Sequence, residues 1–155
     1  MKNCFTAVFV DLQRTKALID ICHKYGGEAV FHRAFDLVAD PFSAVQDLIN
    51  LGAQRILTSG QKPKAWDGRG LLKALQENFG KEIEILAGSG INVTNALQLM
   101  EATGVEQVHS SCKAWSEDAT TSGTSVSFEY APAPHCSDYE IVSEELVKGL
   151  QDLIS

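Results

Sequence analysis

Residues 29–36 read Ala-Val-Phe-His-Arg-Ala-Phe-Asp (AVFHRAFD), and residues 55–60 read Arg-Ile-Leu-Thr-Ser-Gly (RILTSG). In each stretch a run of apolar residues, typical of a buried strand, is followed by polar side chains. Ionisable groups at the end of a buried strand are costly unless they are paired or useful. The two stretches therefore predict both the strands of the fold and the place where functional groups gather.

Amphipathic helices alternate with these strands. Leu18, Ile21 and Tyr25 predict a helix over residues 12–25, and Asp40-Pro41 supplies a capping carboxylate and a proline for the start of the next one. The other predicted elements are strands over 29–36, 55–59, 83–87 and 107–111, a helix containing Leu71, Leu72, Leu75 and Phe79, and a helix capped by Asn92 with Ala96, Leu97 and Met100 facing inward. Strands recurring at roughly 30 residues are typical of βαβ units and predict a parallel sheet, in a barrel or a doubly wound fold.

The two ends of the chain carry less regular patterns. Phe5 to Val10 is apolar and predicts one earlier strand, while residues 113–140 lack a sustained period and predict a long irregular loop. Ser143 is expected to cap a C-terminal helix within residues 141–155. We expect a single domain over residues 1–155.

Charge and cysteine content exclude several classes of partner. The chain has 155 residues with 13 basic and 20 acidic side chains, a net charge of −7, and no run of Lys or Arg. Nucleic acid and anionic membranes are therefore not expected as partners, and no apolar stretch reaches the ~20 residues of a membrane span. Four separated cysteines without a C-x-x-C motif predict reduced thiols in a cytoplasmic protein.

His32, Arg33 and Asp36 are the first candidates for catalysis. Strand alternation would place His32 and Asp36 on the same side, with His32 as general acid or base, Asp36 as its orienting carboxylate and Arg33 as an anion anchor. The alternative is a structural network without catalysis. Thr58 and Ser59 end the next strand, where hydroxyls either bind a ligand or cap the turn.

Two further segments follow later strands. In Ala87–Asn92 (AGSGIN), Gly88 and Gly90 lie in a turn that either cradles a phosphate or carboxylate or is a plain strand-to-helix turn. Val108–Lys113 (VHSSCK) brings His109 and Cys112, soft ligands that suit Cu(I), together with Ser111 and Lys113 as candidate ligand-binding residues.

Taken together, FHRAFD, RILTSG, GSGI, VHSSCK and the later DYEIVSEELV resemble the CutC family of copper homeostasis proteins. The resemblance implies a TIM barrel, in which these segments correspond to strands 5 to 8 and the candidate residues surround its mouth. A TIM barrel usually needs ~250 residues, so we expect a partial barrel made of about strands 4 to 8, with strands 1 to 3 missing. Such a half-barrel is expected to self-associate into a homo-oligomer, to be an incomplete product, or to fold as an open layer.

The resemblance implies copper binding or copper handling in the cytoplasm, with a copper ion or a small anionic ligand as partner. One alternative is a TIM-barrel enzyme acting on a small anionic or carbonyl substrate at the barrel mouth. Another is a truncated, non-catalytic paralogue.

Overall fold

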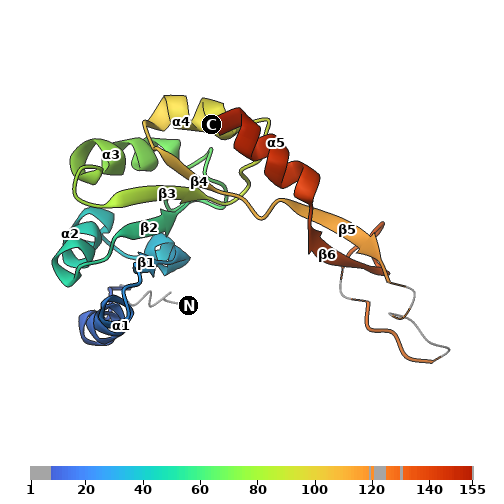
Figure 1. Ribbon diagram of the computed structural model, residues 1–155, viewed down its shortest axis with the longest axis horizontal. Helices are drawn as coiled ribbons and strands as arrows, with labels where there is room; N and C mark the ends of the chain where they lie inside the picture. The colour runs from blue at the N-terminus through green and yellow to red at the C-terminus, as the bar shows by residue number, and fades with distance from the viewer. Residues whose placement is uncertain (1–7, 119, 121–124, 130, 155) are drawn as a thin grey trace, which may run out of the picture. The chain divides into compact units, whose positions relative to one another are not determined.

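A computed structural model describes residues 8–118, 120, 125–129 and 131–154. The chain divides into two compact units, of which the first ends at Ser110 and the second begins at Ser111. The first unit contains a four-stranded parallel sheet with the order β1-β2-β3-β4 (Figure 1). Its strands are β1 (Val30–Phe31), β2 (Arg55–Thr58), β3 (Glu84–Gly88) and β4 (Gln107–His109). The predicted parallel α/β sheet is thus confirmed.

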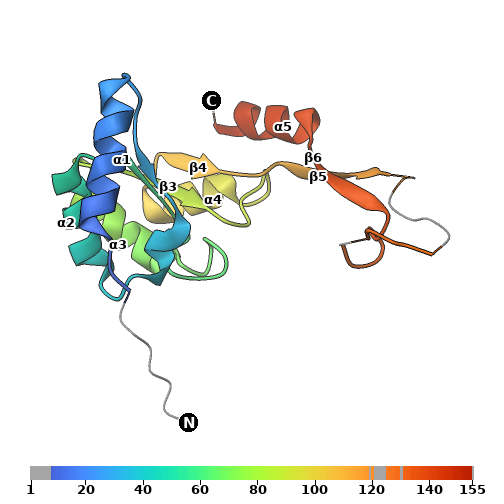
Figure 2. The same cartoon turned by 90° about the horizontal axis from the view of Figure 1, so that it is seen from below.

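The described residues of the same unit form four α-helices: α1 (Leu12–Lys24), α2 (Pro41–Leu51), α3 (Arg69–Phe79) and α4 (Ala96–Thr103). The predicted start of α2 is confirmed, because Oδ1 of Asp40 accepts hydrogen bonds from the backbone N–H groups of Phe42 and Ser43. Gly52 ends α2 with φ 89°, a left-handed conformation that glycine adopts without strain. Helix α1 packs beside α2 (Figure 2).

The start of α4 differs from the prediction. The helix begins after Asn95, and the side chain of Asn92 instead accepts a hydrogen bond from the N–H of Thr94 in the preceding turn. Leu97 is exposed, whereas Ala96, Leu99 and Thr103 are buried. The inward face of α4 therefore follows the 96-99-103 spacing of one helical stripe, and the inward assignment of Leu97 was wrong.

The two faces of the sheet have different surroundings. In the centre of the sheet Ile56 and Ile85 are buried neighbours. Helices α2, α3 and α4 cover one face of the sheet (Figure 1), and the burial of the two isoleucines assigns them to that face. The alternating positions Leu57 and Leu86 point to the opposite face and remain partly exposed. The core of the unit thus lies between one face of the sheet and its helices.

The first strand is much shorter than predicted. The chain leaves the sheet after Phe31, and Arg33–Leu37 forms a 3₁₀ helix, η1, so the predicted strand over 29–36 was wrong. The reason is local: Nδ1 of His32 accepts a hydrogen bond from the N–H of Ala34 and so caps η1. Likewise β4 ends at His109 rather than at residue 111. Of the predicted strand over 5–10, residues 5–7 lie outside the described residues, and residues 8–10 form no strand.

The second unit contains β5 (Lys113–Glu117), β6 (Asp138–Val142) and α5 (Glu144–Ile154). The two strands pair antiparallel, from Lys113 opposite Val142 to Glu117 opposite Asp138. The predicted irregular loop over 113–140 was therefore wrong at both of its ends, since pairing between distant segments leaves no local period to read. The predicted cap of α5 is confirmed, because Oγ of Ser143 accepts a hydrogen bond from the N–H of Leu146.

The longest of the described helices, α1, has 13 residues. A membrane-spanning helix needs about 20 apolar residues. Among the helices that the structure describes, none is therefore long and apolar enough to cross a membrane.

Candidate functional site

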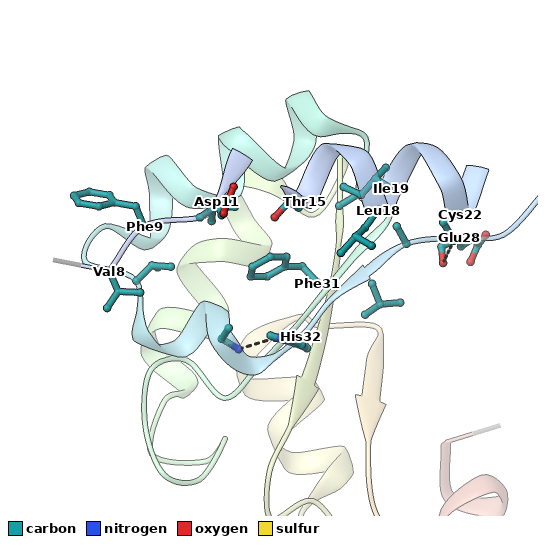
Figure 3. A pocket seen from close by; sticks show the side chains of 16 residues that line it. Val8, Phe9, Asp11, Thr15, Leu18, Ile19, Cys22, Glu28, Phe31 and His32 are labelled. Atoms are coloured by element: carbon teal, nitrogen blue, oxygen red, sulfur yellow. Dashed lines mark hydrogen bonds between the residues drawn. The ribbon is translucent and has the colours of Figure 1, made fainter. Parts of the chain in front are cut away.

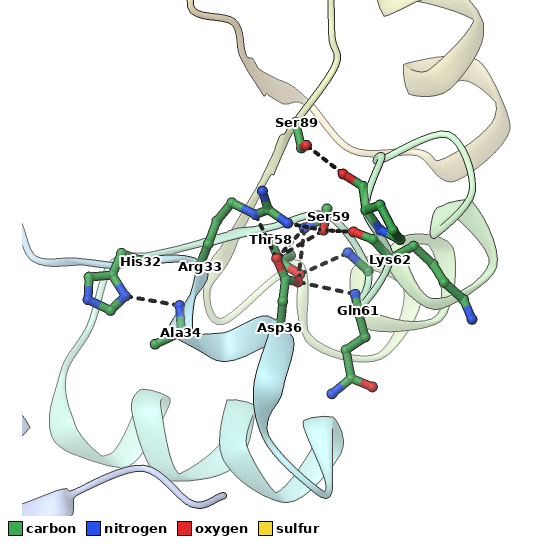
Figure 4. Close-up of polar contacts among 11 residues, drawn as sticks. His32, Arg33, Ala34, Asp36, Thr58, Ser59, Gln61, Lys62 and Ser89 are labelled. Atoms are coloured by element: carbon green, nitrogen blue, oxygen red, sulfur yellow. Dashed lines mark hydrogen bonds and ion pairs between the residues drawn. The ribbon is translucent and has the colours of Figure 1, made fainter. Parts of the chain in front are cut away.

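A buried carboxylate lies at the carboxyl end of the sheet, where η1 meets the end of β2 (Figure 4). Asp36 accepts hydrogen bonds from the hydroxyl of Thr58 at 2.5 Å, from Nε of Arg33 at 2.7 Å and from the hydroxyl of Ser59 at 2.9 Å. The backbone N–H groups of Ser59 and Gln61 donate to it at 3.0 and 3.1 Å. We call this set the Asp36 cluster; its members are Arg33, Asp36, Thr58, Ser59 and Gln61.

The loop after β2 is shaped so that its N–H groups reach this carboxylate. Gly60 has φ 68°, and a Cβ atom there would lie 2.3 Å from the carbonyl oxygen of Gly68. A Cβ atom on Gly68 would in turn lie 1.9 Å from the carbonyl oxygen of Ser59. The backbone segments at Gly60 and Gly68 therefore pass each other at a distance that only glycine allows. This contact folds the loop over Asp36.

The cluster holds Asp36 in its ionised form. Burial raises the pKa of this carboxyl group, but hydrogen bonds from Thr58, Arg33, Gln61 and Ser59 together outweigh burial and lower its pKa below the ordinary 3.8. The side chain of Asp36 is only 8% exposed, whereas that of Arg33 is 42% exposed. Asp36 is therefore an anchored anion whose oxygen atoms already have protein donors.

Thr58 and Ser59 are fully buried within this cluster. Besides its bond to Asp36, the hydroxyl oxygen of Thr58 accepts a hydrogen bond from the N–H of Gly60. The hydroxyl of Ser59 accepts from Nη2 of Arg33 at 2.7 Å and lies 2.5 Å from the carbonyl oxygen of Lys62. Both hydroxyls are thus engaged inside the protein, and their predicted ligand-binding role stays a prediction.

His32 does not share a face with Asp36, because the strand ends before either residue. Its Nδ1 accepts from the N–H of Ala34, so a neutral ring carries its proton on Nε2. Figure 4 shows the imidazole directed away from the carboxylate. The predicted arrangement in which Asp36 orients His32 was therefore wrong, and a catalytic role of His32, Arg33 and Asp36 stays a prediction. The residue that sequence reasoning missed is Gln61, which contributes its backbone N–H and so has no sequence signature.

The turn after β3 contains two consecutive residues in the left-handed conformation. Gly90 and Ser89 both have positive φ, of 74° and 87°. The strained conformation of Ser89 is held by a hydrogen bond from its hydroxyl to the carbonyl of Pro63 and by the N–H of Ala65, which donates to the carbonyl of Ser89. A Cβ atom on Gly88 would lie 2.6 Å from Cδ1 of Leu57, the end of a flexible side chain.

The backbone N–H groups that open the α4 region are used internally. The N–H groups of Asn95 and Ala96 donate to the carbonyl oxygen of Asn92. The N–H of Thr94 donates to the side chain of Asn92, and the N–H of Asn92 donates to the side chain of Asn95. These four N–H groups cannot at the same time cradle a phosphate. The contacts are those of a plain strand-to-helix turn, and the ligand-binding role of Gly88 and Gly90 stays a prediction.

The remaining candidates follow β4. His109, at the end of that strand, has an exposed imidazole in the first unit. Ser111, Cys112 and Lys113 belong to the second unit, where Cys112 has φ 43° and forms no disulfide bond. Nζ of Lys113 lies 2.7 Å from Oε1 of Glu140, so this cation already has an anionic neighbour. Within the residues that the structure describes, no three His, Cys, Asp or Glu side chains are gathered for a metal ion.

Comparison with known proteins shows which family the chain resembles. The family model of the CutC family matches residues 6–114. A family protein CutC of Treponema denticola is 37% identical over 146 residues, which cover 93% of this chain and 58% of the relative. A family protein CutC of Histophilus somni is 40% identical over 113 residues, covering 70% of this chain and 46% of the relative. The chain thus spans about half the length of these curated relatives.

A solved structure supports the same relationship. The Streptococcus agalactiae protein named as a copper homeostasis protein CutC is 30% identical, with a TM-score of 0.59 over 65% of this chain and 49% of that one. Residues 6–114, which the family model matches, include β1 to β4 and the whole Asp36 cluster. On this evidence the chain belongs to the CutC family.

Proposed function

We propose that this chain takes part in copper homeostasis. The observation that carries the proposal is the family match over residues 6–114, since the solved relative is named for copper homeostasis. Imidazole and thiolate groups suit Cu(I) by ligand type. The segment that begins at the end of β4 contains one of each, His109 in the first unit and Cys112 in the second, and we keep each of them, taken by itself, as a candidate contact for copper.

Copper is then a cargo that exchanges, rather than an ion that holds the fold together. The Asp36 cluster is complete without a metal, because every interaction that fixes it comes from protein donors. Among the described side chains, no set of three or more typical ligands is assembled. A structural metal site needs such a set, whereas a cargo ion can be held by fewer groups and passed on.

The proposal includes the architecture and the compartment. The four parallel strands correspond in this proposal to strands 5 to 8 of a TIM barrel, within the predicted partial barrel of about strands 4 to 8. Support comes from the described helices of the first unit, which cover one face of the sheet (Figure 1). Cys22, Cys112 and Cys136 form no disulfide bond within the described residues, which suits the reducing cytoplasm.

The test is anaerobic titration of the full chain with Cu(I) in competition with a coloured chelator. The variant His109→Gln/Cys112→Ser removes both candidate contacts. The matched control, His23→Gln/Cys22→Ser, removes an imidazole and a thiol from α1. We expect wild type and control to bind Cu(I) with the same affinity, and the His109/Cys112 variant to bind at least tenfold more weakly. Equal affinity in all three proteins would refute the assignment.

A further inference from the structure

A polar pocket lies in the first unit, between the loop that follows β2 and the start of α4. Its volume of about 670 Å³ is within the range of about 300–1,000 Å³ that is usual for small-molecule sites. Another pocket, between α1 and β1, has a different character because its lining is mainly apolar (Figure 3). The polar pocket is lined by residues between 64 and 98, among them Lys64, Trp66, Asp67, Asn92 and Gln98, and by none of the Asp36 cluster. It is therefore a candidate binding site distinct from that cluster.

The loops that form the walls of the polar pocket are tied to each other. The N–H of Ala65 donates to the carbonyl of Ser89 at 3.0 Å, and the hydroxyl of Ser89 donates to the carbonyl of Pro63 at 2.7 Å (Figure 4). On the α4 side, Nδ2 of Asn95 donates to the carbonyl of Gly90 at 2.8 Å. These bonds fix the shape of the pocket before a ligand binds, which lowers the entropy cost of binding.

Lys64 gives the pocket a positive charge. A Cβ atom on Gly90 would lie 2.7 Å from Cδ of Lys64 and 3.5 Å from its Nζ, so this side chain runs along the wall. Within the described part of the chain no carboxylate forms an ion pair with Lys64, whereas Arg33 is paired with Asp36. The loop over residues 59–69 contains three basic residues and one acidic residue, although the whole chain has a net charge of −7. An ammonium group in such a loop attracts a phosphate as a point charge.

Trp66 gives the pocket a flat apolar surface. Its side chain is 40% exposed, although tryptophan is normally well buried. The guanidinium carbon of Arg69 lies 4.9 Å from the centre of the ring, and Nη1 of Arg69 donates to the carbonyl of Trp66 at 2.8 Å. Arg69 does not line the pocket, so it supports the indole from outside and leaves the lining side open. An open indole surface held in this way suits stacking with a planar ring.

Asp67 and Gln98 give the pocket hydrogen-bonding groups. Both side chains are exposed, and neither forms a hydrogen bond or ion pair with the residues that the structure describes. A carboxylate can accept hydrogen bonds from ribose hydroxyl groups. A glutamine carboxamide has the donor and the acceptor that match the edge of adenine. The four side chains thus offer one group for each part of a nucleotide.

We propose that this pocket binds a nucleoside monophosphate. Lys64 contacts the phosphate, and Trp66 stacks on the base. Asp67 accepts hydrogen bonds from the ribose, and Gln98 pairs with the edge of the base. A single phosphate suits a single ammonium group, whereas the net charge of −7 disfavours a long polyanion such as nucleic acid. The proposal goes beyond copper homeostasis and is independent of it, because neither candidate copper contact lines the pocket.

The first test is an NMR titration of the full chain with adenosine 5′-monophosphate (AMP) in the absence of copper. The chain contains two tryptophans, Trp66 and Trp115, and therefore two indole N–H signals, which the variant Trp66→Phe assigns. We expect the Trp66 signal to shift and to saturate as AMP is added. A Trp66 signal that does not move at concentrations of about 5 mM would overturn the proposal, since the affinity would then be negligible.

The second test is calorimetry, which separates the contacts. Lys64→Ala and Trp66→Leu are expected to weaken AMP binding about tenfold each. Lys62→Ala is the matched control, because Lys62 is an exposed cation of the same loop that does not line the pocket, and it should leave the affinity unchanged. Amide NMR spectra check that each variant is folded.

Ribose 5-phosphate and inorganic phosphate are the partial ligands in the same experiment. Both lack the base and are expected to bind about tenfold more weakly than AMP. If ribose 5-phosphate binds as tightly as AMP, the base is not recognised. If Lys62→Ala weakens binding as much as Lys64→Ala, only the general charge of the loop attracts the ligand. Either result contradicts the proposed site.

Discussion

The sharpest consequence of the Asp36 cluster is the effect of Asp36→Asn on stability. The substitution keeps the size of the side chain but removes the charge, and it turns one acceptor oxygen into an NH₂ donor that faces existing donors. Oδ1 accepts from Thr58 and Gln61, and Oδ2 accepts from Arg33. One of these two groups of donors must lose its partner, whichever way the amide is turned.

The expected cost follows from the number and kind of bonds. A hydrogen bond to a charged group contributes about 1.5–3 kcal/mol, and a donor left unpaired in a buried position costs about 1–3 kcal/mol. Because Arg33 is 42% exposed, water partly replaces its lost partner. We therefore expect Asp36→Asn to lower the free energy of unfolding by about 3 kcal/mol, a large share of the ~5–15 kcal/mol that stabilises a domain. At about 2–4 °C per kcal/mol for a chain of 155 residues, the Tm falls by about 6–12 °C.

The assay is urea unfolding followed by far-UV circular dichroism, with thermal melts beside it. Asp20→Asn is the matched control, because Asp20 pairs with Lys16 on the exposed surface of α1. Such pairs contribute at most about 1 kcal/mol. If Asp36→Asn unfolds within the error of wild type, or no earlier than Asp20→Asn, the cluster does not hold η1 to β2 and the reasoning is refuted.

Three further predictions concern the same unit. Gly68→Ala should prevent stable folding, because its Cβ would lie 1.9 Å from the carbonyl oxygen of Ser59, whereas Gly70→Ala, with no atom within 4 Å, should stabilise α3 by about 0.5–1 kcal/mol in urea unfolding. Folding lowers the pKa of Asp36, so its charge contributes fully to the free energy of unfolding above the unfolded pKa of about 3.9. This contribution is lost as the pH falls through the folded pKa. The free energy of unfolding, measured from pH 6 down to about pH 2, should therefore fall less in Asp36→Asn than in wild type. Asp40→Ala should cost about 1 kcal/mol in thermal unfolding by leaving the first turn of α2 uncapped, and an unchanged Tm would contradict that role.

Local sequence patterns were enough to predict the alternation of strands and helices in the first unit. Apolar periodicity and terminal residues such as Asp40 and Gly52 fixed the helices to within a few residues, because capping and helical stripes depend on neighbours three or four positions away. The motifs FHRAFD and RILTSG also located the Asp36 cluster, since polar groups at the ends of adjacent parallel strands come together at one edge.

The partners of those polar groups, in contrast, depend on contacts between segments that are distant in the sequence. The end of β1 at Phe31 depends on a cap made by His32 and on a carboxylate drawn toward β2, and the donor from Gln61 is a backbone group that any residue would supply. The pairing of β5 with β6 joins segments more than twenty residues apart, beyond the reach of local periodicity. Side-chain patterns report neighbours along the chain, whereas unpaired edges and internal hydrogen bonds depend on which distant segments meet in space.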